Sequence, residues 1–228
     1  ESLSVDNRKR GNLKSLVSSF GIVLKNRRYV YYVLQMGFAM GVLFANISSS
    51  PFIVQQHYGF SAFEFSLFFG INALAIGLAA GLSVKFKNPE HAMFLGSVGM
   101  TMMSAVEFVI LSNEYHFAVY EAVLFVLLFS MGLTCTASTT LAMDCERANS
   151  GTASALFGAA GFAFGGIVSP LVGLGDILST TGLIFFVCSV CSLCFSVLAM
   201  NQTHTNLWGS FKCKMGPVTR FVFLRREK

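Results

Sequence analysis

The stretch Ser150–Gly173 reads SGTASALFGAAGFAFGGIVSPLVG and contains no charged side chain. A helix that crosses the hydrocarbon core of a bilayer, about 30 Å thick, needs about 20 apolar residues, and this stretch is long enough. Most of its residues are Gly, Ala, Ser or Thr, which present very little side chain to a lipid or to a protein core. The residues around it must therefore explain why a membrane-length segment is built from such small side chains.

The composition of the whole chain is that of a membrane protein. Apolar residues make up 54% of the 228 residues and charged residues only 12%, against about 25% in ordinary soluble domains. The chain has 24 Phe, and its mean hydropathy is +0.64. Its six Cys do not indicate a secreted disulfide framework, because four of them lie inside apolar runs. Because it has neither an initiator Met nor a signal-peptide pattern, we expect a fragment of a longer protein.

Runs of about 20 apolar residues recur along the chain, separated by short connections. They are continuously apolar, whereas the strands of a membrane barrel alternate over about ten residues. Helices are then the way to satisfy the backbone in lipid. The sequence therefore predicts an all-α membrane protein with six transmembrane helices, at Tyr29–Ser49, Ser61–Val84, Ala92–Leu111, Ala118–Thr139, Ser150–Leu174 and Ile177–Met200.

The basic residues are divided unequally between the two sides of this bundle. All sixteen Lys and Arg lie before the first span, in the second and fourth connections, or after the last span. The positive-inside rule makes that side cytoplasmic, so both termini are predicted to be cytoplasmic. A basic patch for nucleic acid is the alternative, but it would not explain this partition. We expect a lipid bilayer as the surroundings and no nucleic acid as a partner.

Three regions follow from this pattern. Residues 1–28 are predicted to be a cytoplasmic linker, residues 29–200 the six-helix transmembrane bundle, and residues 201–228 a basic cytoplasmic tail. The linker holds apolar residues at helical spacing among Lys and Ser, which favours a short amphipathic helix at the membrane surface. An ordinary linker is the alternative. The apolar positions are Leu13, Leu16, Val17, Phe20 and Leu24.

Small residues in the fifth span recur at steps of three or four, which places them in one stripe on a helix. Such a stripe lets two helix backbones approach closely in lipid. It lowers helix propensity by up to about 1 kcal/mol for each Gly, so another helix is expected to pack against it. Static packing and a sliding interface are both open interpretations. The stripe is Gly151, Ser154, Gly158, Gly161, Gly165, Ser169 and Gly173, and Pro170 predicts a bend.

These residues resemble a known family. Glu1-Ser2-Leu3 is similar to the PE-[ST]-L signature that follows the sixth span of many major facilitator superfamily transporters. The stretches FANISSSPFIVQQHYGFSAFEFSLFFGINAL and GTASALFGAAGFAFGGIVSPLVG resemble the Bcr/CflA group of drug efflux transporters. The resemblance covers residues 1 to 200 in order. The connection GLSVKFKNPEH and the tail depart from the family pattern, so no gating role is assigned to the first and no function to the second.

The resemblance implies that the six spans are the C-terminal half of a twelve-span fold. It implies two three-helix inverted repeats, residues 29–111 and 118–200, and a fifth span at the interface with an N-terminal six-helix half. The antiporter motif and the usual proton-carrying acids of the family lie in that other half. The first and fourth spans are implied to line the substrate cavity.

The first and fourth spans contain aromatic residues and a few polar ones, which suits bulky amphipathic ligands. Packing within the bundle is the alternative for each Phe, and an interhelical hydrogen bond is the alternative for the amides. Asn72 is expected to serve packing as well. The cavity candidates are Gln35, Phe38, Phe44, Asn46, Phe125, Phe129, Thr134 and Thr136.

Glu107 is the one acid well inside a predicted span, and a buried acid in a membrane is a functional candidate. Proton coupling is one interpretation, and a side chain that reaches the outer surface is the other. Glu64 and Glu121 begin their spans and are expected to be solvated. Asp144 and Glu146 lie beside Arg147 in the fourth connection, where interdomain ion pairs are expected.

Other chemistry is not supported. The Cys of the sixth span have no His beside them, so no metal is expected, and there is no phosphate-binding loop for ATP. We expect no enzyme and no cofactor, with a proton gradient as the energy source. The predicted function is proton-coupled multidrug efflux by an alternating-access antiporter in a bacterial inner membrane, with antibiotic resistance as its consequence. A sugar or metabolite exporter and a non-conducting membrane scaffold are the alternatives.

Overall fold

The computed structural model describes the backbone of residues 13–214 and the side chains of residues 18–202. In this part of the chain every regular element is a helix. Six helices are long and apolar enough to cross a membrane, which confirms the predicted fold class. The elements are α1 Leu13–Leu24, α2 Arg27–Pro51, η2 Phe52–His57, α3 Ala62–Ser83, α4 Pro89–Ser112, α5 Phe117–Cys145, η3 Arg147–Asn149, α6 Ser150–Leu171, η4 Val172–Leu174 and α7 Ile177–Lys214.

Local sequence sets where several helices begin. The side chain of Asn26 accepts the backbone N–H of Tyr29 in the first turn of α2, and that of Asn88 accepts the backbone N–H of Glu90 in the first turn of α4. At the start of α3, Ser61 and Glu64 form a reciprocal capping box. These short polar side chains mark the points at which the chain re-enters the apolar bundle.

The C-terminal end of α2 is shaped by a proline. Pro51 lacks an N–H and its ring crowds the preceding turn, and the helix continues through Phe52–His57 with wider π-type turns. The chain then reverses at Gly59, whose φ of +76° is a conformation that glycine adopts without strain. This turn brings α3 back along the bundle.

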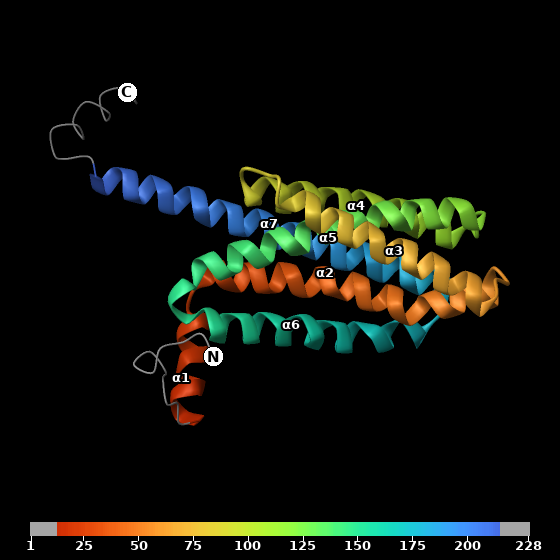
Figure 1. The fold of residues 1–228 in the computed structure, drawn as a ribbon, viewed down its shortest axis with the longest axis horizontal. Helices are drawn as coiled ribbons and strands as arrows, with labels where there is room; N and C mark the ends of the chain where they lie inside the picture. The colour runs from red at the N-terminus through yellow and green to blue at the C-terminus, as the bar shows by residue number, and fades with distance from the viewer. Residues whose placement is uncertain (1–12, 215–228) are drawn as a thin grey trace, which may run out of the picture.

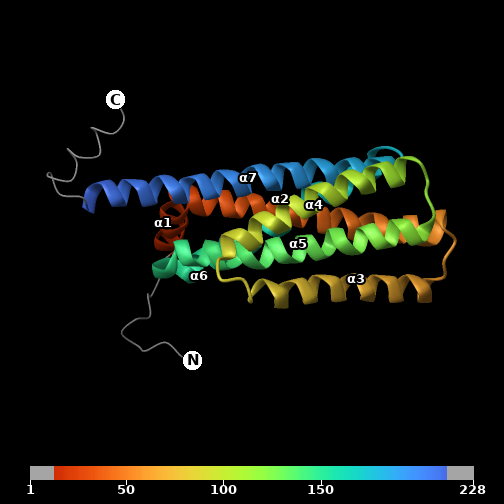
Figure 2. The ribbon, with the colours of Figure 1, turned by 90° about the horizontal axis from the view of Figure 1, so that it is seen from above.

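The helices form a layered bundle with internal symmetry (Figures 1 and 2). Helices α2 and α5 are central; α6 packs on α2 as α3 packs on α5, and α7 packs on α2 as α4 packs on α5. Helices α4 and α7 also contact each other. Each of these helix contacts therefore recurs when every helix is replaced by the one three places away in the chain. Because successive helices are antiparallel, a helix and its counterpart three places away run in opposite directions. The segments α2–α4 and α5–α7 thus form the two inverted three-helix repeats.

The core lies along the central helices in two clusters. One, toward the end that carries η2, includes Ile53, Tyr120, Leu124 and Phe185. The other, toward the chain termini, includes Tyr29, Tyr32, Ala142 and Ala153. Helices α3 and α6 pack on the bundle from one side only, and most of their surface is exposed.

The regions next to the bundle follow the sequence in part. Helix α1 lies across one end of the bundle, roughly at right angles to the long helices (Figure 1). Helix α7 continues past Met200 to Lys214, so the beginning of the predicted tail is helical. Residues 1–12 with the Glu1-Ser2-Leu3 signature, and residues 215–228, lie outside the described residues.

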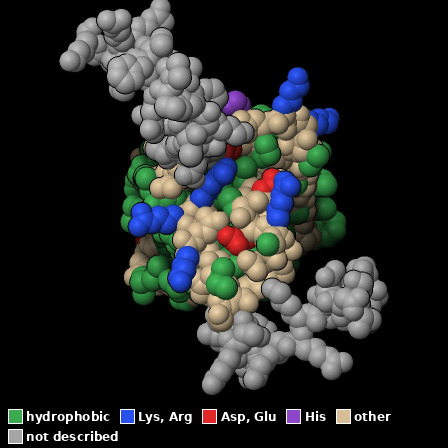
Figure 3. Space-filling view, turned by 90° about the vertical axis from the view of Figure 1, so that its left-hand side faces the viewer, with side chains coloured by type: hydrophobic (Ala, Val, Ile, Leu, Met, Phe, Trp, Pro, Cys, Tyr) green, Lys and Arg blue, Asp and Glu red, His purple; other side chains and the backbone are tan. Residues whose placement is uncertain are grey.

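Charge is separated along the long axis of the bundle. Every Lys and Arg with a described side chain lies at the end that carries α1, where blue side chains gather in Figure 3. The opposite end carries Glu64, Glu114, Asp176, His57 and His116. We call the first the basic end and the second the acidic end. The basic residues are Lys25, Arg27, Arg28, Lys85, Lys87 and Arg147.

Candidate functional site

The contact between α2 and α6 explains part of the small-residue stripe. The ring of Phe44 on α2 lies directly against Gly165, and the ring of Phe164 on α6 lies against Gly37. A methyl group added at Gly37 would come within 2.6 Å of Phe164. Gly161 is also buried in this contact, beside Met40. Each helix therefore supplies a glycine that receives a phenyl ring of the other, which holds them at a short distance.

The remaining small residues of α6 face away from the bundle. Gly151, Ser154 and Gly158 are exposed, and a methyl group added at Gly151 or Gly158 would meet no other atom within 4 Å. Pro170 is exposed near the end of α6, which closes with the tight turn η4. The predicted single stripe is thus divided into a packed edge and an open edge.

The aromatic candidates of α2 take part in helix packing. Phe38 meets Phe164 of α6 edge to face, with ring centroids 4.9 Å apart, and stacks on Phe195 of α7 at 5.8 Å. Phe44 meets Phe162 at 6.0 Å. In this structure both rings occupy contacts between helices, the alternative that the sequence left open, and their part in a cavity stays a prediction.

Gln35 joins three helices through hydrogen bonds. Its Nε2 donates to Ser192 Oγ on α7 at 3.0 Å, and Ser138 Oγ on α5 donates to its Oε1. Ser192 Oγ also donates to the Gln35 carbonyl oxygen at 3.1 Å. The side chain is fully buried and its polar atoms are satisfied. Gln35 therefore links α2, α5 and α7, as the interhelical interpretation expects.

Asn46 and Thr136 form hydrogen bonds within their own helices, and Thr134 forms one between two helices. Asn46 Oδ1 accepts from Ser50 Oγ one turn later at 2.7 Å. Thr134 Oγ1 donates to the carbonyl oxygen of Met93 at 2.6 Å and so connects α5 to α4. Thr136 Oγ1 donates to Gly132 O within its own helix. These groups stabilise the bundle in this structure.

A groove of about 630 Å³ runs between α3 and α5 and contains one of the predicted cavity residues. Its wall on α5 is the ring of Phe129, and its wall on α3 is almost entirely apolar. Lys85 closes it at the basic end. We call this space the α3–α5 groove, and its lining is Ala73, Leu74, Gly77, Leu78, Gly81, Leu82, Lys85 and Phe129.

Phe125 and Phe129 are separated by four residues on α5, so they share one side of the helix. Just beyond the groove the two helices touch at Gly132, where an added methyl group would lie 2.8 Å from the carbonyl oxygen of Ile76. The groove therefore lies beside a very close helix contact and is open on the outer surface of the bundle.

Glu107 on α4 is completely buried. Neither oxygen of its carboxyl group has a hydrogen-bond partner among the described residues. One interpretation of the sequence was that this side chain reaches the outer surface. The structure does not place it there. A charged acid at the centre of a membrane helix costs about 2.5–3.5 kcal/mol on insertion scales, so an acid retained there is a functional candidate.

Glu121 was expected to be solvated, and that prediction is wrong. Its Oε1 accepts a hydrogen bond from Asn72 Nδ2 of α3 at 2.9 Å, and its Oε2 is buried without a hydrogen-bond partner among the described residues. Helix α5 begins at Phe117, so Glu121 lies in its second turn, where α3 and α4 pack. Its place near the start of an apolar run does not reveal which side of the helix it occupies.

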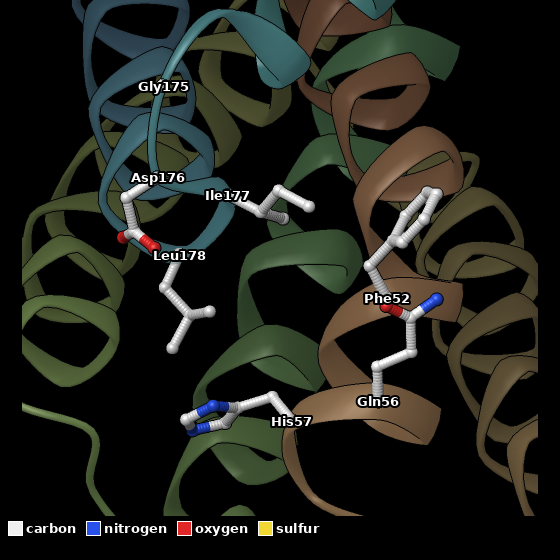
Figure 4. Close-up of a pocket in the computed structure, with 7 residues that line it drawn as sticks. All are labelled: Phe52, Gln56, His57, Gly175, Asp176, Ile177 and Leu178. Atoms are coloured by element: carbon white, nitrogen blue, oxygen red, sulfur yellow. The ribbon is translucent and has the colours of Figure 1, made fainter.

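The acidic end also contains a crevice of about 390 Å³ between the end of α2 and the start of α7 (Figure 4). His57 and Gln56 reach into it from one side, and Asp176 borders it from the other. Asp176 Oδ2 accepts the backbone N–H of Ser179 at 2.9 Å, at the first turn of α7. The hydrogen bonds from Ser179, with a smaller contribution from His57, hold the pKa of Asp176 below its ordinary value.

Ion pairs and hydrogen bonds tie the helices together at the basic end. Arg28 Nη2 forms a 2.9 Å ion pair with Glu90 Oε1 at the start of α4. Asn26 Nδ2 donates to Glu146 Oε1 at 2.7 Å, joining α2 to the end of α5. Arg147 pairs with Asp144 within one turn at 2.9 Å.

Comparison with known proteins agrees with this architecture. Residues 2–170 match the family described as Major Facilitator Superfamily. The chain is 33% identical over 211 residues to the "Uncharacterized MFS-type transporter YdgK" of Bacillus subtilis, across 90% of this chain and 52% of that protein. The chain therefore spans about half the length of this curated relative.

Proposed function

Since the chain belongs to the major facilitator superfamily, we propose that it is the C-terminal half of a secondary transporter that works by alternating access. The six spans, their inverted repeats and the half-length match to a relative named as a transporter support this proposal. Its partner is then an N-terminal six-helix half.

The observation that carries the proposal for substrate binding is the α3–α5 groove. It is lined by Leu, Ala and Gly with one aromatic ring, and it opens on a helix face that no described residue covers. An apolar, aromatic wall with a single charged group at one end suits a bulky amphipathic organic compound. A sugar would require several hydrogen-bonding groups, which this wall does not supply. The drug efflux group that the sequence resembles fits the same chemistry.

The open edge of α6 is the proposed contact with the N-terminal half. Gly151, Ser154 and Gly158 present a smooth backbone there, and two such surfaces can shift against each other without interlocked side chains. The packed edge, at Gly161 and Gly165, keeps α6 fixed on α2 during that movement. Rocking of the two halves against each other would then expose the groove to each side of the membrane in turn.

We propose proton antiport as the energy source. The buried Glu107 supports this, because an acid without a hydrogen-bond partner in a membrane bundle is most readily stabilised by a proton. With both termini on the cytoplasmic side, the basic end faces the cytoplasm and export runs outward.

The test is efflux by the full-length protein in inverted membrane vesicles, with ethidium as a lipophilic cationic probe and an acidic interior. Ethidium uptake into the vesicles is expected only while the pH gradient is maintained. Phe129→Ala should reduce the initial rate about tenfold, because a lost apolar contact in a binding pocket is worth 10-fold or more. Phe63→Ala, at an exposed position outside the groove, is the matched control.

An unchanged rate for Phe129→Ala would reject the groove as the substrate surface. Uptake that persists after an uncoupler abolishes the pH gradient would reject proton antiport. If the protein, shown to be folded by size-exclusion chromatography, transports neither ethidium nor other lipophilic cations under any gradient, the drug efflux assignment is contradicted.

A further inference from the structure

A fully buried acid of α4 and a half-buried acid of α5 interact electrostatically near the acidic end. Glu107 on α4 and Glu121 on α5 are near enough for their charges to interact. Three of their four carboxylate oxygens have no hydrogen-bond partner among the described residues, and the fourth accepts from Asn72. Helices α4 and α5 are in extensive contact, so this arrangement belongs to the packed part of the bundle.

A second buried group points to the same place. Tyr120, next to Glu121 on α5, is completely buried, and its hydroxyl has no hydrogen bond of ordinary geometry although it approaches Ser50 of α2. Both acids interact electrostatically with this phenol. A buried hydroxyl without a partner is costly unless something binds to it at some stage of the working cycle.

The charge surrounding the acids does not neutralise them. Besides Tyr120, the titratable group near Glu107 is Tyr58 after η2, which Glu114 of the next connection also influences. Helix α3 contributes the neutral Asn72, and α2 contributes the neutral Ser50. The outer part of α7, from Ile177 to Val187, contains no acidic, basic, Tyr or Cys side chain. No Lys or Arg with a described side chain lies at this end.

We propose that Glu107 and Glu121 together form one proton-binding site on the outer side of this half. Two adjacent carboxylates in a low-dielectric site cannot both remain ionised without a cation, and one shared proton removes half of their charge. The single amide donor, Asn72, stabilises one ionised carboxylate at Glu121, which leaves Glu107 as the group that carries the proton. The site itself rests on this geometry, and its use in energy coupling rests on the proposed function.

The position of the pair connects it to both water and the groove. Glu107 lies five residues before the end of α4, about 7.5 Å along the helix axis, so the outer side is the nearer source of protons. Glu121, Phe125 and Phe129 follow one another at four-residue steps on α5, so the acid and the groove wall lie along the same side of the helix. The Asn72–Glu121 hydrogen bond joins the two helices that form the groove. Proton binding at the pair thus acts on the α3–α5 contact.

The experiment follows protonated carboxyl groups by infrared spectroscopy in the full-length protein, reconstituted in lipid nanodiscs and titrated between about pH 5 and pH 10. The carboxylic-acid signal should fall as the pH rises. Glu107→Gln should reduce this pH-dependent signal at least about twofold, because it removes the group that carries the proton, and Glu121→Gln should shift the pH at which the signal is lost, because it removes the neighbouring negative charge. Glu64→Gln, an exposed acid in the capping box of α3, should leave it unchanged.

A measurement on the unmodified protein guards against variants that fail to fold. Dicyclohexylcarbodiimide reacts with protonated carboxyl groups in apolar surroundings, and peptide mass spectrometry should find its label on Glu107 or Glu121, decreasing severalfold with rising pH. Label found only on other acids, or an unchanged infrared titration in both folded variants, would overturn the proposal. A carboxylic-acid signal that sodium chloride abolishes and choline chloride does not would assign the pair to a metal cation and would also overturn it.

The outcome is separable from that of the proposed function. A titration that depends on the pair, in a protein without proton-driven efflux, would leave the proton site and reject the transport role. Proton-driven efflux with a titration that neither variant affects would leave the transporter and reject this site.

Discussion

At the scale of single residues, glycine has two different uses in α6. Gly165 receives the ring of Phe44 and leaves no room for a methyl group, whereas Gly158, two turns earlier, faces open space. The same residue type therefore fixes one contact and leaves another surface smooth. Sequence spacing cannot separate these uses, because both glycines lie in one stripe with steps of three or four.

Gly165→Ala is expected to lower the stability of the bundle by about 1–3 kcal/mol, because the added methyl group forces the Phe44 ring out of its place. In this six-helix half without its partner, Gly158→Ala should be neutral or stabilising by up to about 1 kcal/mol, because it raises helix propensity where nothing is displaced. The measurement is the thermal transition of the purified six-helix half in detergent, followed by size-exclusion chromatography.

The double variant Gly165→Ala with Phe44→Leu provides the control. If the ring causes the loss, this pair should be coupled and the double variant should recover part of the stability. Equal thermal transition temperatures for Gly165→Ala and Gly158→Ala would show that the contact between Phe44 and Gly165 does not hold α6 on α2.

At the scale of the elements, α3 is attached to the bundle almost entirely through α5. It packs on α5 through the close approach at Gly132 and through the Asn72–Glu121 hydrogen bond, while most of its surface is exposed. One side of α3 is therefore packed on α5, and the rest of its surface is open and can form a wall of the α3–α5 groove.

Gly132→Ala should separate α3 from α5, because the methyl group would lie 2.8 Å from a backbone oxygen of Ile76, which cannot rotate away. We expect a loss of about 1–3 kcal/mol in stability and a wider groove. The measurement is the distance between spin labels at exposed positions Leu78 and Val126, by pulsed electron resonance.

Gly77→Ala is the matched control on the facing helix, because a methyl group there meets no atom within 4 Å. It should change neither the stability nor the label distance. An unchanged distance in Gly132→Ala would contradict the account of how α3 is held.

The elements could be predicted from the sequence, and most of their contacts could not. The six spans coincide with the observed helices to within a few residues at most ends, because a bilayer requires long apolar runs and the polar caps interrupt them. The predicted first span ended at Ser49, whereas the helix continues through Pro51 and then in π-type turns to His57. Helices such as α5 and α7 are apolar on all sides, so their sequences do not reveal which side packs.

This limit explains the outcome at the candidate site. Phe129 borders the groove, whose other lining residues lie on α3 and at Lys85, and its part in a substrate cavity stays a prediction. The same reasoning gave no signal that Phe38 would stack on Phe195. Glu107 stood out as an acid within an apolar run. Glu121 did not, because its burial depends on where α3 and α4 pack around the first turns of α5.

At the scale of the whole molecule, the bundle has inverted internal symmetry and a strong separation of charge along its long axis. The described Lys and Arg side chains all lie at one end, beside α1, and the acidic pair lies toward the other. The symmetry supplies two helices with large exposed faces, α3 and α6. In the proposed function, these exposed faces are the surfaces for substrate and for the N-terminal half.

The central claim is that this bundle crosses the membrane with its basic end in the cytoplasm. The most direct test labels single cysteines, introduced at Gln56 and at Lys87 of a full-length protein whose native Cys are replaced by Ser, with a membrane-impermeant maleimide on intact cells. The account predicts that Gln56→Cys is labelled from outside and that Lys87→Cys is labelled only after the membrane is permeabilised. Labelling of both positions from the same side would contradict it.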